Sequence, residues 1–138
     1  MNVKFNSAGQ AIAKNDLDSV SFKVMFCDPA YTPDPDTEVY LSDVSANRAS
    51  GTTDIAVTLT INVDNTDNRT EFDFTNAVTG TITAETNAVV LYIDTGTDST
   101  SELLTYNELV NGSGTPTTYN VVAGVLTATV DADGLFSI

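Results

Sequence analysis

Carboxylate pairs are the side chains of this sequence that come closest to doing chemistry. Asp64, Asp67 and Asp73 stand near enough to one another to be considered as the acid and base of a hydrolase. Asn65 and Asn68 lie between them, so the same stretch also offers oxygen ligands for calcium. Its order differs from that of an EF-hand loop, which needs oxygen ligands at alternate positions and a glycine at the sixth. Asp and Asn in turns accept hydrogen bonds from nearby backbone amides, and we predict such a turn here.

A second acidic pair, Asp131 and Asp133, is followed directly by Gly134. Asp-Gly is a hairpin-turn signal, so a turn is again the prediction. Glycoside hydrolases also use two carboxylates, but their sugars usually stack on exposed aromatic rings, and tryptophan is absent from this chain. Neither acidic pair therefore predicts a catalytic site.

The sequence lacks the residues that other catalytic and metal-binding sites need. The sequence has no histidine, which removes Ser-His-Asp and Cys-His mechanisms and the commonest zinc and iron ligand. Cys27 is the single cysteine, so a thiolate metal site cannot form within one chain, and no histidine is present to activate the thiol. No glycine-rich loop joins a strand to a helix to hold phosphate. We therefore predict a protein that is not an enzyme and needs no metal or cofactor.

Charge is the strongest compositional signal. Five basic residues face nineteen acidic ones, for a formal net charge of −14, and no lysine or arginine follows Arg69. Such a surface repels phosphate backbones, which disfavours direct binding of nucleic acid. It also keeps the protein soluble until a partner offers positive charge. Adaptation to a salty medium would give the same surface, and the composition does not separate the two explanations.

Length and apolar content predict one domain over residues 1–138. A chain of 138 residues, 41% of them hydrophobic, is long enough to bury a core without metals or disulfides. One cysteine excludes an intrachain disulfide and fits a reducing compartment such as a bacterial cytoplasm. The first residues lack the apolar core of a secretory signal. The longest apolar run, residues 88–93, is far shorter than a membrane helix, so we expect no membrane contact.

Alternation of apolar and polar residues predicts strands along most of the chain. Residues 53–63 form the clearest run, which predicts one long strand with a single buried face. Residues 20–27 alternate in the same way, with Phe26 predicted to point inward and Cys27 outward. Residues 88–93 have no polar face, which predicts a central strand covered on both sides. A last alternation at residues 125–130 predicts a closing strand. The branched apolar residues of the first run are Ile55, Val57, Leu59, Ile61 and Val63.

Turn signals recur from Pro33 to Gly134 at intervals of about eight to twelve residues, a spacing typical of sandwiches and barrels. We therefore predict an all-β, single-domain antiparallel β-sandwich or barrel of the jelly-roll type. Only the stretch from residue 6 to residue 15 suits a helix, with Ala8 and Ile12 on one face. An N-terminal arm over residues 1–15 that docks on a neighbouring molecule is an equally physical interpretation.

Short segments recur in an order that resembles one known family. Tyr31-Thr-Pro-Asp-Pro-Asp-Thr37 is followed by Leu41-Ser-Asp-Val-Ser-Ala-Asn47 and a Ser-Gly-Thr turn at residue 50. Residues 64–73, 81–97 and 133–138 continue the likeness, which covers about residues 16–138. This order resembles small all-β virion structural proteins of tailed bacteriophages. Two marks of that family are missing here, an aromatic-glycine run after the Ser-Gly-Thr turn and a tryptophan before residue 81.

The resemblance implies a structural part of the virion, made in the cytoplasm of a bacterial host. We expect a capsid decoration or cement protein on the head surface, which contacts the major capsid protein and itself as a homotrimer. A tail, connector or fibre-associated protein is the alternative within the virion. A calcium-dependent sugar-binding β-sandwich is a further alternative, which the missing tryptophan and the poor calcium loop disfavour.

The loop around Tyr31 is the segment that we expect to meet a partner. Pro33 and Pro35 restrict its backbone, which lowers the entropy lost on binding. Its acids would suit a basic groove on the partner, although a solvated connection between strands would have the same composition. The basic residues of the N-terminal half add to this expected contact. The predicted contact residues are Tyr31, Asp34, Asp36, Glu38, Lys4 and Lys14.

Overall fold

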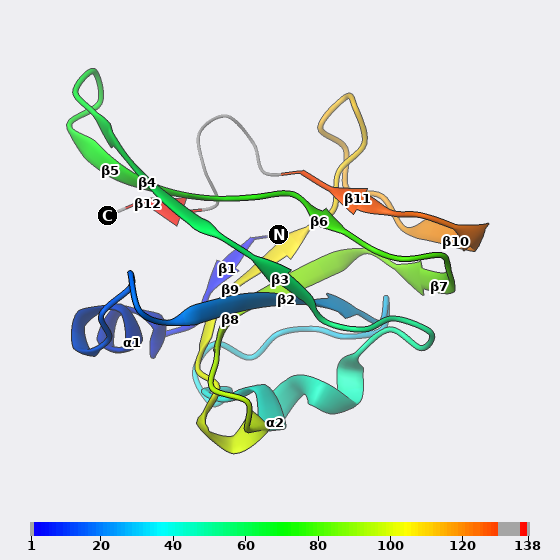
Figure 1. Cartoon of the computed structure of the whole chain (residues 1–138). Coiled ribbons are helices and arrows are strands. Elements are labelled where there is room, and N and C mark those ends of the chain that lie inside the picture. The colour runs from blue at the N-terminus through cyan, green and yellow to red at the C-terminus, as the bar shows by residue number, and fades with distance from the viewer. Residues whose placement is uncertain (1, 130–135, 138) are drawn as a thin grey trace.

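Two layers of antiparallel strands form the body of the protein (Figure 1). The structure is a computed structural model that describes residues 2–129 and 136–137. One layer is a five-stranded sheet, and the other consists of three narrower sheets. In spatial order the large sheet contains β1 (Val3–Lys4), β9 (Leu103–Glu108), β8 (Ala88–Asp94), β2 (Ser21–Cys27) and β3 (Ile55–Val57). The narrow sheets are β12–β5–β4 (Phe136–Ser137, Arg69–Phe74, Leu59–Asp64), β11–β6 (Thr127–Ala128, Ala77–Val78) and β10–β7 (Tyr119–Gly124, Ile82–Thr86).

The predicted all-β sandwich is confirmed, and the barrel alternative is wrong. The described strands stay in four separate sheets, so the large sheet faces the narrow ones without closing on itself. The prediction of a single domain over residues 1–138 stays a prediction. No helix in the described part of the chain is long and apolar enough to cross a bilayer.

The large sheet is buried on both faces, which explains why β8 has no polar side. Val89 and Leu91 join the apolar cluster between the two layers, whereas Val90 and Tyr92 join a second cluster on the opposite face. The prediction of a central, doubly covered strand is therefore confirmed. The alternation in β2 divides between the same two clusters, so Cys27 does point away from Phe26. It reaches a second core there rather than solvent, and its side chain is fully buried.

Short helices cover the second face and one end of the large sheet (Figure 1). The predicted N-terminal helix is confirmed as α1 (Ala8–Lys14), and the residues before it pack on this chain's own core, with Phe5 fully buried. Helix α2 (Leu41–Val44) and the 3₁₀ turn η1 (Ser45–Asn47) were not predicted. The carboxylate of Asp43 accepts the N–H groups of the two residues before this helix, which caps its first turn. Another 3₁₀ turn, η2 (Asp98–Thr100), lies between β8 and β9.

The prediction of one long strand over residues 53–63 is wrong. The chain leaves the large sheet at Thr58, so β3 pairs with β2 and β4 pairs with β5 in a different sheet. Thr58 and Thr75 exchange hydrogen bonds at the point of departure. Val57 is buried, but Val63 is 70% exposed although it continues the same alternation. At the C-terminal end β11 covers residues 127–128 of the predicted closing strand, whereas Val130 lies outside the described residues, as do Asp131, Asp133 and Gly134.

Candidate functional site

The predicted contact residues gather around β9, at the β1 edge of the large sheet. Lys4 in β1 lies opposite Thr105. The ring of Tyr31 meets the ring of Tyr106 edge-on, with 5.7 Å between ring centroids. Segments that are distant in sequence, residues 2–7 and 28–40, thus lie against one strand. We call these two segments together the arm–loop surface.

Asn6 ties the arm to the loop. Its side-chain amide donates a 2.6 Å hydrogen bond to Oδ1 of Asp36, and its backbone N–H donates to the carbonyl of Pro35 at 3.2 Å. Phe5, one residue earlier, donates its backbone N–H to the carbonyl of Leu104 and buries its ring in the core. The arm and the loop are therefore fixed to each other and to the sheet.

The loop is also held by its own acidic side chains. Glu38 Oε2 accepts hydrogen bonds from the Tyr31 hydroxyl (2.7 Å) and from the backbone N–H of Asp34 (2.8 Å). Oδ1 of Asp34 accepts the N–H of Asp36, and Oδ1 of Asp28 accepts the N–H of Ala30. These contacts define one backbone shape, so a partner would meet a preformed surface.

Tyr31 and Glu38 have an internal role in this surface. The Tyr31 ring is only 7% exposed, because it packs in the core cluster beneath the large sheet. Burial raises the pKa of the Tyr31 hydroxyl, and the hydrogen bond and charge of Glu38 raise that pKa further. Asp28, Asp34 and Asp36 are exposed, so they are the acids of residues 28–40 that a partner can reach.

Of the two predicted lysines, Lys4 belongs to the arm and Lys14 lies beyond it in helix α1. Lys4 is exposed on the short edge strand β1. Lys14 closes helix α1 and its Nζ lies 3.0 Å from Oε1 of Glu102, with half of the lysine side chain exposed. The arm–loop surface therefore presents three exposed carboxylates, Asp28, Asp34 and Asp36, beside one exposed lysine, Lys4. Lys14 lies outside this surface and is paired within the chain.

Cys27 has no nucleophilic character. Burial is the main cause, and the nearby carboxylate of Asp54 the next, of a thiol pKa raised to about 12. The prediction that Cys27 is a structural thiol agrees with this position, although its predicted outward orientation leads into a second core.

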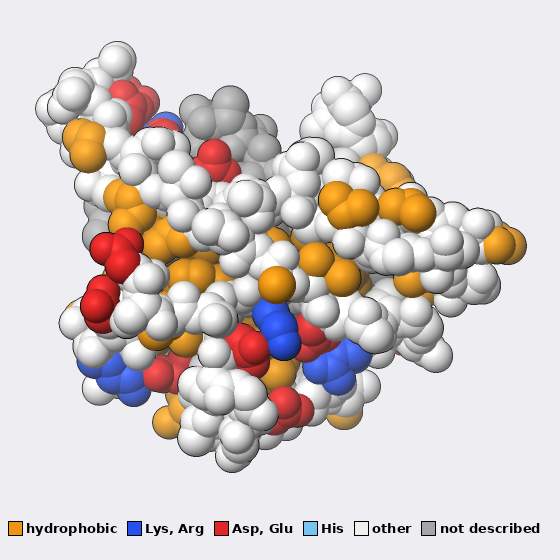
Figure 2. Space-filling model, viewed as in Figure 1, with side chains coloured by type: hydrophobic (Ala, Val, Ile, Leu, Met, Phe, Trp, Pro, Cys, Tyr) orange, Lys and Arg blue, Asp and Glu red, His pale blue; other side chains and the backbone are white. Residues whose placement is uncertain are grey.

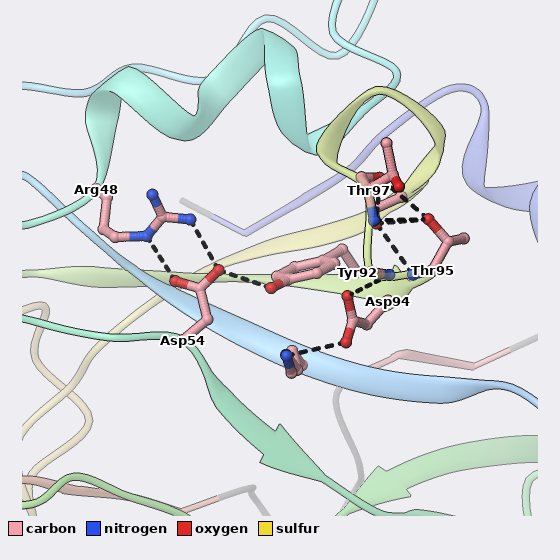
Figure 3. A network of polar contacts seen from close by, with 9 residues as sticks. Arg48, Asp54, Tyr92, Asp94, Thr95 and Thr97 are labelled. Carbon is pink, nitrogen blue, oxygen red and sulfur yellow. Dashed lines mark hydrogen bonds and ion pairs between the residues drawn. The ribbon is translucent and has the colours of Figure 1, made fainter.

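A network of polar contacts that the sequence did not predict joins three elements (Figure 3). Arg48 follows η1 and holds Asp54 through two nitrogens, at 2.6 and 2.8 Å. The hydroxyl of Tyr92 in β8 donates to the same carboxylate at 2.6 Å. The contact ties the α2–η1 segment to the start of β3 and to the centre of the large sheet. Its partners are separated by up to 38 residues in the chain, so no local pattern could reveal it.

A second part of the same view joins Lys23 of β2 to Asp94 at the end of β8 (Figure 3). Its ammonium lies 2.9 Å from Oδ2 of Asp94, and this contact is the main cause of the lowered pKa of that carboxyl. Hydroxyl groups of Thr95, Thr100 and Ser101 then bond one another and the carbonyl of Thr97. This cluster satisfies its own donors and acceptors, so it orders a turn.

The Asp64 segment forms the turn that its sequence predicts. It links β4 to β5, and Oδ1 of Asp64 accepts the N–H groups of Thr66 and Asp67. These backbone hydrogen bonds are the leading cause of the lowered pKa of Asp64. Among the described residues no three acidic or thiol side chains are grouped as metal ligands would be.

Exposed branched apolar side chains mark the layer of narrow sheets (Figure 2). The most exposed are Val122 in β10 at 74% and Val63 in β4 at 70%. Both lie on strands that pair on one side only, in the pairs β10–β7 and β4–β5. The arm–loop surface is polar and the exposed narrow-sheet strands are apolar, so the two regions suit different contacts.

Comparison with known proteins identifies no relative of this chain. No family model, no curated protein and no solved structure matches the chain. The arrangement itself is an acidic loop that hydrogen bonds hold on an all-β scaffold.

Proposed function

We propose that this chain is a non-enzymatic structural protein of a tailed-bacteriophage virion, which decorates the head and cements the capsid lattice. The observation that carries the proposal is the order of short segments that resembles that family, from Tyr31 to the last residues of the chain. The proposed partners are the major capsid protein and further copies of this chain, arranged as a homotrimer on the head surface.

The negative net charge supports the proposal that this protein is added to the outer surface of a DNA-filled head. A net charge of −14 repels nucleic acid, so the protein would not be diverted to the genome during assembly. The same charge suits a basic patch on a capsid subunit and keeps free copies apart before assembly.

The arm–loop surface supports the proposal because its loop is already ordered before a partner binds. Asp34 and Asp36 are exposed, yet their loop is held by hydrogen bonds from Asn6 and to Glu38. A fixed loop loses little conformational entropy on binding. Many weak contacts of this kind, repeated over a lattice, add up to strong attachment.

Quantitative mass spectrometry of purified particles tests the proposal. The measurement compares the copy number of this chain with those of the major shell and tail-tube proteins, before and after heads and tails are separated. Hundreds of copies that remain with the heads would support decoration of the capsid. A count of about six to twelve, or recovery with tails, would favour a connector or tail protein, and absence from particles would overturn the virion assignment.

A further inference from the structure

An apolar pocket opens between the two layers, on the face of the large sheet opposite Tyr31. Its volume is about 200 Å³. The walls come from the large sheet on one side and from the narrow sheets on the other. The apolar side chains that line it include Val24, Val57, Phe74, Ala77, Val89 and Leu109.

One polar group in this pocket has no partner within the described chain. Asn107 in β9 lines the pocket and is only 7% exposed, and its Oδ1 accepts no hydrogen bond. It lies opposite Val89 of β8, a member of the cluster between the two layers, so its side chain faces the same space. Buried acceptors are almost always paired in folded proteins. The amide oxygen in this apolar wall is therefore free to accept a hydrogen bond from a group that enters the pocket.

The size of the pocket sets the size of the occupant. A dry engineered cavity of about 150 Å³ binds benzene. A volume of about 200 Å³ accommodates one aromatic ring with a small substituent. The flat ring would contact the branched side chains of Val57 and Val89 from the large sheet and of Phe74 from β5.

The net charge of −14 disfavours an anionic occupant. Glu108 follows Asn107 in β9 but pairs with Ala88, so its side chain is directed to the opposite face of the large sheet. A carboxylate or phosphate also has no proton to donate to Oδ1 of Asn107. A neutral group with a single O–H or N–H satisfies the acceptor without adding charge.

We propose that this pocket binds a neutral aromatic group that carries one hydrogen-bond donor, such as a phenol or an indole. The ring lies between the two layers, and its donor bonds to Oδ1 of Asn107. The group is either a free small molecule or a tyrosine or tryptophan side chain of a partner. This inference stands on the pocket alone and does not depend on the virion assignment.

Titration of the whole chain with p-cresol, followed by amide chemical shifts in NMR spectra, tests the site. We expect saturable shifts at Val57, Val89 and Leu109. Toluene, which has the same ring without the donor, provides the comparison. In Asn107→Leu the preference for p-cresol over toluene falls by about fivefold, the value of one hydrogen bond.

Two further variants separate pocket filling from general damage. Ala128→Leu places a larger side chain in the pocket lining and abolishes the shifts, whereas Val122→Leu on the exposed face of β10 leaves them unchanged. N-acetyl-tyrosinamide distinguishes the sources: its binding with p-cresol-like shifts shows that a tyrosine side chain carried by a peptide fits the pocket, and its exclusion leaves the free molecule as the occupant. Absent p-cresol shifts, or an unchanged preference in a folded Asn107→Leu variant, would overturn the proposal.

Discussion

The hydroxyl of Tyr92 donates a 2.6 Å hydrogen bond to Oδ2 of Asp54, the carboxylate that Arg48 also holds (Figure 3). The Asp54 side chain is 12% exposed, so its charge is largely removed from water and depends on these two partners. The contact connects the centre of β8 to the segment between α2 and β3. It therefore fixes the layer that covers the second face of the large sheet.

Tyr92→Phe removes this hydrogen bond while keeping the ring in the core. We expect the free energy of unfolding to fall by about 1.5–3 kcal/mol, since the lost bond goes to a charged group in a buried setting. Urea unfolding at neutral pH measures the change. Tyr119→Phe is the matched control, because its hydroxyl bonds an exposed carbonyl at Val110, and we expect a loss below about 0.5 kcal/mol. Equal losses in the two variants would contradict the role of Asp54.

The buried thiol of Cys27 makes stability depend on alkaline pH. Its pKa is about 12 in the folded chain, against 9.0 for an ordinary thiol. Between these values the unfolded chain has lost the proton and the folded chain keeps it, so stability is complete below pH 9 and falls as pH rises. Each such group contributes a slope of about 1.4 kcal/mol per pH unit.

Cys27→Ala removes that contribution. We expect the fall in unfolding free energy between about pH 10 and 12 to become shallower by about 1.4 kcal/mol per unit. Burial also raises the pKa of Tyr31 and of Tyr92, and these two tyrosines contribute the same pH dependence of stability in both proteins. Urea unfolding over this pH range gives the two slopes. Parallel curves would show that the thiol is not protected from ionisation.

Gly51 occupies a position that no other residue fits. Its φ is +86°, and a Cβ atom placed there would lie 2.5 Å from the carbonyl oxygen of Thr83. Gly96 has a similar φ of +81° but open space around it. We expect Gly96→Ala to cost about 1 kcal/mol through backbone strain alone, and Gly51→Ala to cost about 2 kcal/mol more because the chain must also shift. Thermal unfolding compares them, and a Gly51→Ala cost no larger than that of Gly96→Ala would rule out the clash.

Residues 53–63 are divided between two sheets, so a Val→Ala substitution should have unequal effects on stability in β3 and in β4. Val57→Ala leaves a gap in the core between the layers and should reduce the free energy of unfolding by about 1–3 kcal/mol. Val63 is 70% exposed on β4, so Val63→Ala should change stability by less than about 0.5 kcal/mol. Urea unfolding of both variants checks the expectation, which fails if the two losses are alike.

Attachment to capsids should depend on Asp34 and Asp36. Asn at both positions removes two charges and keeps the oxygens that accept hydrogen bonds from Asp36 and Asn6. We expect about a tenfold or greater loss of binding to heads that lack this chain, with unchanged stability, and a weaker dependence on salt. Co-sedimentation with such heads gives the affinity.

Glu85→Gln with Asp67→Asn is the matched control, because it removes two exposed charges from the layer of narrow sheets, in β7 and in the turn between β4 and β5. Equal binding by both double variants would exclude this surface as the contact. Deletion of residues 1–15 would not serve the same purpose, because Phe5, Ala8 and Ala11 are buried in the core.

The sequence alone predicts part of the arm–loop surface. The acidic, proline-restricted loop and the N-terminal helix both follow from local sequence. Their meeting at Asn6 and Asp36 does not, because the two residues are 30 positions apart. We predict that Tyr31 faces a partner, but its ring packs in the core cluster beneath the large sheet, because burial of a large aromatic surface outweighs exposure.

The sequence by itself determined that the chain is all-β, that 88–93 is a central strand and that Asp64 begins a turn. These features depend on periodicity and turn chemistry, which act over a few residues. Only the tertiary structure decided where the 53–63 run leaves the large sheet, which face buries Cys27 and which hydroxyl completes the Arg48–Asp54 pair. Such choices depend on which distant segments cover a surface, and alternation along one strand is the same whether its apolar face meets a core or water.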